Sequence, residues 1–238
     1  MVRPPRRLGS SAILLGTLLL ACGGDPYARH NPAEAARGGA AQASPGGGSP
    51  AAGGEATTAP LGKILPGAPL PLEQMLGQEP AAAESRVGPP LPDSKGEMRD
   101  KCVRYLPERT WFRCRYAWQR YSDPTKTFGV VQLTYEDGKV AGVAMEKLPG
   151  EGPFDPRKAL AMVGLELPGE PTVEHPAEGV TVWSWWNARA RLRVHGRQYY
   201  VRVSSVDDGW DRAKVEIILN DVLSDDERAR VIEDDAGG

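Results

Sequence analysis

The stretch ARARLRVHGRQYYVRVSS, residues 188–205, decides the fold class. Apolar and polar side chains alternate along both halves of it, which is the pattern of a half-buried β-strand. Gly196-Arg197 lies between the halves and predicts a tight II′ turn that joins them as a hairpin. The expected cross-strand pairs are Val194 with Tyr199, Leu192 with Val201, and Ala190 with Val203. Because every pair is apolar, one face of this hairpin is predicted to lie in a core.

The opposite face of the same hairpin gathers cationic and aromatic side chains, and we name it the arginine face. Its members are Arg189, Arg191, Arg193, Tyr200 and Arg202, with Trp186 at the end of the hairpin. Guanidinium groups in such a row suit an anionic ligand or an acidic protein surface. The alternative is a solvated face whose arginines pair with acids elsewhere. The segment from Asp207 to Asp235, with eleven acidic and four basic residues, is the natural internal partner.

Period-two alternation recurs in other regions of the chain. The residues after Thr110 that are predicted to share one strand face are Phe112, Cys114, Tyr116 and Trp118. Residues 128–136 and 139–147 flank Asp137-Gly138, which is a strong signal for a hairpin. Residues 180–186 and 214–219 are also predicted to be strands.

Two helices are expected. Asp155-Pro156 offers an N-cap followed by a proline at the first helical position, which predicts a helix over residues 155–166. Ser224 and Glu227 form a capping box that opens a short C-terminal helix. The sequence therefore predicts an α+β domain, in which a mostly antiparallel, twisted sheet carries one helix packed on a face.

The chain divides sharply by composition. Between Gly23 and Gly96, 45 of 74 residues are Gly, Pro, Ala or Ser, so this part holds too few apolar groups to offset its chain entropy. We therefore expect residues 22–96 to be a flexible linker and residues 97–238 to form a single domain. Within the linker, Leu72, Met75 and Leu76 either form one face of a helical turn that docks on the domain or belong to an unstructured stretch.

The charge balance of the predicted domain excludes one class of partner. Residues 97–238 carry 21 basic and 24 acidic residues, and the whole chain has a formal net charge of −2. A nucleic-acid-binding domain of this size would need a basic excess. We therefore predict no nucleic-acid partner.

Three cysteines are an odd number, so an exported protein of this composition needs a separate role for one of them. Cys102 and Cys114 are predicted to form a disulfide in an oxidising compartment, worth about 3 kcal/mol by loop entropy. Two buried free thiols are the alternative. A zinc site is disfavoured because His175 and His195 are not at suitable spacing from the cysteines.

The first 22 residues have the features of an export signal. Arg3, Arg6 and Arg7 precede the apolar run of residues 11–20, which is too short to span a bilayer. The run ends in Leu19-Leu20-Ala21-Cys22, which resembles the lipobox of bacterial lipoproteins. The resemblance implies cleavage after Ala21, lipid on the Cys22 thiol and anchoring through two or three acyl chains. Ordinary secretion with a coincidental Cys22 is the alternative.

The residue after the lipobox cysteine bears on location. In the enteric sorting rule, an aspartate at that position retains a lipoprotein at the inner membrane. Here Gly23 follows Cys22. The resemblance therefore implies a lipid-anchored protein of the cell envelope, with the outer membrane favoured over the inner.

Other patterns were weighed for chemistry. Trp183 and Trp185 are assigned to the core by their period, so they do not predict a carbohydrate platform. Glu174-His175 with Glu178, and the turn of residues 207–211, lack the remaining ligands of a metal site. The chain contains no G-x-S-x-G, P-loop or H-E-x-x-H motif. We therefore predict no catalytic residues, no metal and no cofactor.

Two functional hypotheses follow from these patterns. The first is an envelope lipoprotein that presents a small binding domain to an anionic ligand or to an unknown envelope protein. The second is a structural or assembly lipoprotein that has no ligand and only packs against partners. A hydrolase that lacks recognisable motifs is a distant third.

Overall fold

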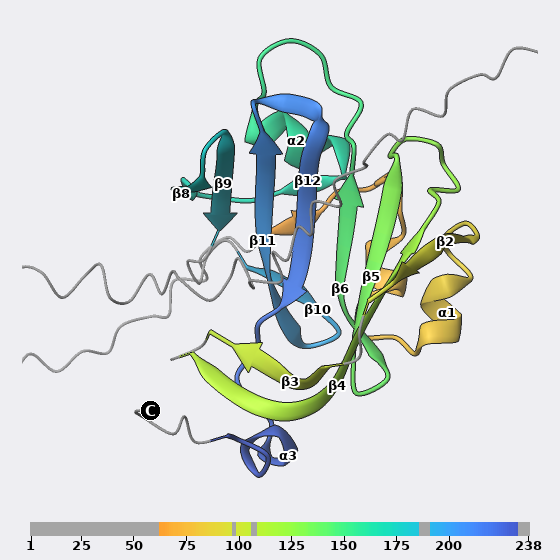
Figure 1. Cartoon of the computed structure of the whole chain (residues 1–238), viewed down its shortest axis with the longest axis vertical. Coiled ribbons are helices and arrows are strands. Elements are labelled where there is room, and N and C mark those ends of the chain that lie inside the picture. Colours follow the sequence, from red (N-terminus) through yellow and green to blue (C-terminus); the bar gives the residue numbers. More distant parts are fainter. Residues whose placement is uncertain (1–61, 97–98, 106–108, 186–190, 233–238) are drawn as a thin grey trace, which may run out of the picture. The chain divides into compact units, whose positions relative to one another are not determined.

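The computed structural model describes residues 62–96, 99–105, 109–185 and 191–232. Within these ranges the chain forms a ten-stranded sheet and a two-stranded sheet whose named strand pairs are all antiparallel. Short helices accompany the sheets (Figure 1). The predicted α+β class is therefore confirmed.

The elements have the following bounds. The large sheet contains β2 (Pro90–Lys95), β3 (Arg99–Arg104), β4 (Thr110–Tyr121), β5 (Val130–Glu136), β6 (Lys139–Glu146), β8 (Thr172–Ala177), β9 (Val180–Trp185), β10 (Leu192–Val194), β11 (Arg197–Val206) and β12 (Gly209–Leu219). The small sheet contains β1 (Lys63–Ile64) and β7 (Leu165–Glu166). The helices are α1 (Pro80–Glu84), α2 (Pro156–Met162) and α3 (Asp225–Arg228), with a 3-10 turn η1 (Leu72–Gln74).

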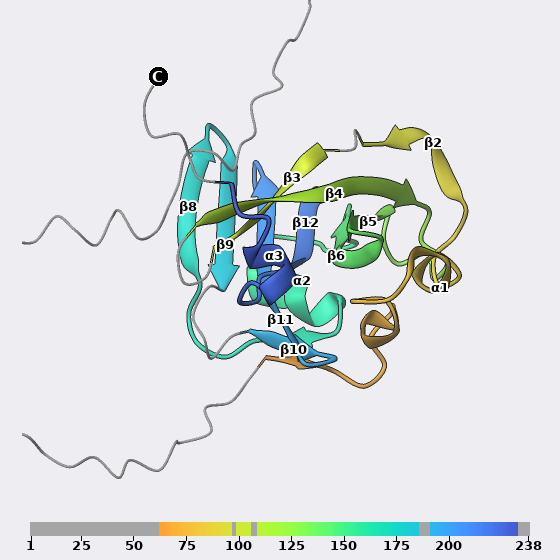
Figure 2. The same ribbon diagram turned by 90° about the horizontal axis from the view of Figure 1, so that it is seen from below.

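The large sheet runs in the order β2-β4-β5-β6-β12-β11-β9-β8. β3 pairs with the first part of β4, and β10 pairs with the first part of β11. Figure 2 shows β3 and β4 on one side of β11 and β12, with α2 on the other side. The sheet therefore has two covered faces, and the two faces differ in chemistry.

One face of the sheet forms the main core. The strand registers align one apolar residue from each of seven neighbouring strands into a row: Tyr121, Val131, Met145, Val215, Val203, Trp183 and Val173. Leu160 of α2 packs into the same core. Burial of such aliphatic side chains stabilises a fold by about 1.5–3 kcal/mol each.

The hairpin at Asp137-Gly138 forms as predicted. Both residues have positive φ, 48° and 79°, as a type I′ turn requires. The central turn of the fold-deciding stretch differs from its prediction. His195 and Gly196, with φ of 49° and 76°, form that turn, so Val194 pairs with Arg197 and Leu192 with Tyr199.

This correction moves the register by two residues and keeps every side chain on its predicted face, because the side-chain period of a strand is two. The place beside Val203 that was predicted for Ala190 belongs to Trp183 of β9. Ala190 itself lies outside the described residues.

Helix α2 starts as predicted but is shorter. The side chain of Asp155 accepts hydrogen bonds from the backbone N–H groups of Arg157 and Lys158, which caps the first turn. The helix ends at Met162 rather than at residue 166, because Gly164 adopts a φ of +77° and Leu165 enters β7. The capping box of α3 is present as predicted.

The predicted linker boundary at Gly96 is wrong. β1 pairs with β7, and η1 delivers Leu72 and the following Met75 and Leu76 into the main core, where all three are fully buried. The docking alternative for this segment is therefore confirmed, and the folded unit includes the described residues from Gly62 onward. Composition missed it because a few well-spaced apolar side chains are enough to anchor a Gly- and Pro-rich segment.

Among the described residues, no helix has the length and apolar character needed to cross a membrane.

The corrected boundary makes a stability prediction. Leu72→Ala should lower the free energy of unfolding of the purified chain by about 2–5 kcal/mol, because it opens a cavity in the core. Gln74→Ala truncates an exposed side chain of the same 3-10 turn and should change the free energy of unfolding by less than about 0.5 kcal/mol. Urea denaturation measures both, and equal values for the two variants would place η1 outside the core.

Candidate functional site: the charged face of the sheet

The second face of the sheet is polar. Its central row, read across neighbouring strands, is Arg120, Gln132, Ala144, Glu216, Arg202, Ser184 and Thr172. In the adjacent row, Glu146 of β6 lies directly opposite Lys214 of β12 in the strand register. We call five ionisable residues that β4, β6, β11 and β12 contribute to these rows, Arg120, Glu146, Arg202, Lys214 and Glu216, the charged face.

The cations of the charged face have carboxylate partners within the fold. Arg202 donates from Nε to Glu216 over 2.9 Å, and Lys214 donates to the other oxygen of Glu216 over 2.8 Å. Arg120 forms an ion pair with Glu146. Burial opposes ionisation of Glu216, but the charges of Arg202 and Lys214 outweigh it and lower the pKa of Glu216 to about 2.

Part of the arginine face, which the sequence left either open or covered, is covered in the structure. Tyr200 is only 3% exposed, and the ring of Tyr105 packs edge-on against it at a centroid distance of 6.5 Å. The side chain of Arg202 is 11% exposed because it lies against Glu216. Sequence alternation placed both residues on the correct face, but it could not show that segments distant in the sequence cover that face.

The remaining members of the arginine face differ from one another. Arg191 is half-buried and donates to the side chain of Gln198 over 2.8 Å. Burial lowers the pKa of Arg191. Arg193 is exposed. Trp186 and Arg189 lie outside the described residues.

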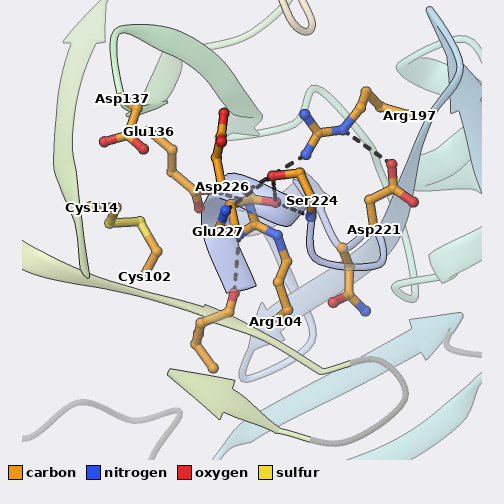
Figure 3. Close-up of polar contacts among 12 residues, drawn as sticks. Cys102, Arg104, Cys114, Glu136, Asp137, Arg197, Asp221, Ser224, Asp226 and Glu227 are labelled. Carbon is orange, nitrogen blue, oxygen red and sulfur yellow. Dashed lines mark hydrogen bonds and ion pairs between the residues drawn. A yellow bond between two sulfur atoms is a disulfide. The ribbon is translucent and has the colours of Figure 1, made fainter. Parts of the chain in front are cut away.

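A buried arginine joins the β3–β4 hairpin to the rest of the domain (Figure 3). Arg104, at the end of β3, has 1% exposure and donates to Glu136 of β5 over 2.6 Å and to Glu227 of α3 over 2.9 Å. Its guanidinium group also lies 4.9 Å from the ring centroid of Phe112. One cation thereby links three elements that are far apart in the sequence.

The two carboxylates around Arg104 differ electrostatically. Burial raises the pKa of Glu136, and Arg104 offsets only part of this effect. Burial opposes ionisation of Glu227 as well, but hydrogen bonds from Ser224 and the charge of Arg104 outweigh it and lower the pKa of Glu227. Figure 3 shows Glu227 between Arg104 and Ser224, at the start of α3.

The acidic C-terminal segment supplies internal partners. Glu216 pairs with Arg202 of the arginine face, and other acids of the segment pair with Arg197, which is not a member of that face. Arg197, which follows the β10–β11 turn, pairs with Asp221 over 3.1 Å and approaches Glu227 at 3.8 Å. The side chain of Asn220 accepts a hydrogen bond from the backbone N–H of Tyr105. Residues 220–227 thus fasten both β3 and β11.

Sequence reasoning missed Arg104 and Glu136 as parts of this cluster. The sequence did offer one signal, the alternation of side chains along a strand. Arg104 lies two residues after Cys102 and therefore shares its strand face. Since Cys102 was expected to be buried in a disulfide, a charge on the same face required a buried partner.

The predicted disulfide is present. Cys102 of β3 and Cys114 of β4 are bonded, with a distance of 5.7 Å between their Cα atoms. The pair forms a small second core with Phe112, against which Tyr116 and Leu223 pack. The bond therefore closes the β3–β4 hairpin beside the buried Arg104, as Figure 3 shows.

The other patterns that were weighed have structural roles. Trp185 is fully buried in the core, and Trp183 packs against Phe154 with ring centroids 5.2 Å apart. Glu174-His175 belongs to strand β8. Asp207-Asp208 forms the tight turn between β11 and β12. A search of the described residues finds no group of three or more side chains that could hold a metal ion.

No protein-family model matches this chain, and no curated protein or solved structure matches it either. Function is therefore inferred from the residues themselves.

The cluster around Arg104 gives the first prediction for this site. Arg104→Ala should lower the free energy of unfolding by about 3–5 kcal/mol, because it leaves Glu136 and Glu227 without their buried cation. The control is Arg228→Ala, which removes an exposed pair with Asp225 and should cost less than about 1 kcal/mol. Similar losses in the two variants, measured by chemical denaturation, would show that the Arg104 cluster is not a stabilising link.

Acid sensitivity gives the second prediction. The pKa of Glu216 in the folded state lies below its ordinary value, so its contribution is present at neutral pH and is lost as the pH falls toward 2. Glu216→Gln should therefore weaken the fall in unfolding free energy between pH 5 and pH 2 by on the order of 3 kcal/mol. Glu151→Gln, at an exposed position, should leave this pH dependence unchanged. An unaltered dependence in Glu216→Gln would contradict the assignment.

Proposed function

We propose that this chain is a lipid-anchored protein of the bacterial envelope whose domain is a protein-interaction module. The lipobox-like Leu19-Leu20-Ala21-Cys22 supports the anchor, and Gly23 favours the outer membrane. Acyl chains on Cys22 would hold the chain at the membrane, since two chains together give stable anchoring.

The corrected domain boundary sets the reach of this module. The expected linker then comprises the ~40 residues between Cys22 and Gly62, which lie outside the described residues; a flexible Gly-rich chain of that length would have a root-mean-square reach of about 35 Å. The domain would thus meet partners within a few tens of ångströms of the lipid surface.

Internal pairing of the charged face argues against the anionic-ligand form of the hypothesis. Arg202 already shares Glu216 with Lys214, and Arg120 has Glu146. An incoming anion would have to compete with these buried carboxylates. A protein partner that uses another surface is the better-supported alternative.

The observation that carries the proposal is the exposed edge strand β8. It lies at the end of the large sheet, and β9 is its only strand partner among the described residues. A strand with an exposed edge offers main-chain hydrogen bonds to an extended segment of another protein, which is an established mode of protein recognition.

The anchor is tested by Cys22→Ser. The variant should remain uncleaved or become soluble, whereas the wild-type chain should fractionate with membranes as a processed protein that incorporates labelled fatty acid. Cys102→Ser combined with Cys114→Ser is the matched control, because it replaces the two disulfide-bonded cysteines without touching the lipobox. A processed Cys22→Ser protein that still fractionates with membranes would rule out the lipid anchor.

A further inference from the structure

The two ends of the large sheet are built differently. At one end, β2 carries Pro90 and Pro92 and follows Pro89, and Asp93 has a positive φ of 50°. Prolines lack the N–H that a further strand would need, which blocks β2. The same outer edge of β4 also carries β3, where the exposed, charged Arg99, Asp100 and Lys101 disfavour a further strand. At the other end, β8 offers Thr172–His175 without a proline, between Pro171 and Pro176.

The unblocked strand also carries an apolar side chain toward solvent. Val173 is 49% exposed, which makes it one of three exposed large hydrophobic residues among those described. It ends the apolar row of the sheet, directly opposite the half-buried Trp183 of β9. Figures 1 and 2 both place β8 at the end of the sheet, beyond β9. The apolar row therefore stops at an exposed residue rather than at a polar one.

We propose that β8 pairs antiparallel with β8 of a second copy of this chain, about a two-fold axis at Val173. The inference rests on the proposed interaction function and names the partner of that same edge. Two copies so joined would continue one sheet across the axis and bring the two Val173 side chains together.

The sequence of β8 selects this register. Residues directly opposite each other in a sheet point to the same face, so a symmetric pairing must be centred on a residue. A centre at Glu174 would oppose two carboxylates. Centres at Thr172 or His175 would bring Pro171 or Pro176 beside the axis and remove ladder hydrogen bonds.

A centre at Val173 avoids the opposed carboxylates and keeps both prolines at least two residues from the axis. It sets Val173 opposite its own copy and Thr172 opposite Glu174 of the second copy, so the directly opposed pairs beside the axis contain no like charges. It also extends the apolar row through Val173 to Trp183 of each copy, where Phe154 packs on the ring at 5.2 Å. The edge is thus complementary to itself in apolar character and in charge.

The same strand limits the pairing to a closed dimer. The register of β8 against β9 shifts between Glu174 and Ala177, and Pro176 lies within this interval. Few residues of β8 can therefore pair with a second copy before the edge ends. Interfaces of this size are weak between free proteins. Anchoring both copies to one membrane through Cys22 would raise their effective concentration, which favours pairing there.

Disulfide trapping in intact cells tests the inference. Val173→Cys in the full-length chain would place two thiols at the axis, where Cβ atoms of opposed residues lie about 4.5–5.5 Å apart. Mild oxidation should convert most of this variant to a species of twice the mass, reversible by reductant. The substitution is at an exposed site, so the fold should tolerate it.

Glu178→Cys is the matched control. It lies in the exposed turn after β8, and the proposed register would hold the two introduced thiols about 30 Å apart. It should stay monomeric on oxidation. Equal dimer yields for the two variants would indicate random collision and overturn the pairing.

The outcomes separate this inference from the proposed function. A Val173→Cys adduct with a different protein would overturn self-pairing while supporting an interaction module that uses the β8 edge. Absence of any adduct would overturn self-pairing and the use of this edge, whereas the membrane fractionation of Cys22→Ser judges the anchor independently.

Discussion

The structure depends on one electrostatic constraint: a charge removed from water needs an internal counter-charge. The β3–β4 hairpin and the C-terminal segment lie against the polar side of the sheet, so the cations there lose solvent. Arg104 meets this constraint with Glu136 and Glu227, and Arg202 meets it with Glu216. The Arg104 pairs fix where the covering segments lie, because they join β3 to β5 and to α3.

The main core is apolar and needs no specific counter-charges. It is the part of the fold that the sequence predicted best. Alternation along β11 assigned Val201 and Val203 to the core and Tyr200 and Arg202 to the opposite face. The turn at 195–196 was misplaced, yet the faces were correct because a two-residue shift preserves parity. The docking of Leu72 was one of two open alternatives. Local composition does not show whether α2 and the sheet leave part of the core for another segment to cover.

The candidate site was less predictable, for a physical reason. Local pattern tells which face a side chain occupies, whereas its exposure depends on segments that fold back from elsewhere. The acidic C-terminal segment was recognised as a candidate partner for arginines, and Asp221 and Glu227 do pair with Arg197. Arg104 escaped notice because its importance comes from Glu136, which lies 32 residues away, and Glu227, which lies 123 residues away. The position of β8 at the end of the sheet, among the described residues, could not be predicted at all without the order of the strands.

The central claim is that buried ion pairs, rather than a ligand, account for the charges on the polar side of this domain. A double-mutant cycle with Arg104→Met and Glu227→Gln tests it most directly, with unfolding free energies measured for the wild type, both single variants and the double variant. The account predicts that the double variant is less destabilised than the sum of the single variants, by about 1–3 kcal/mol, because the two side chains act on each other. Strict additivity, with a coupling near zero, would contradict it.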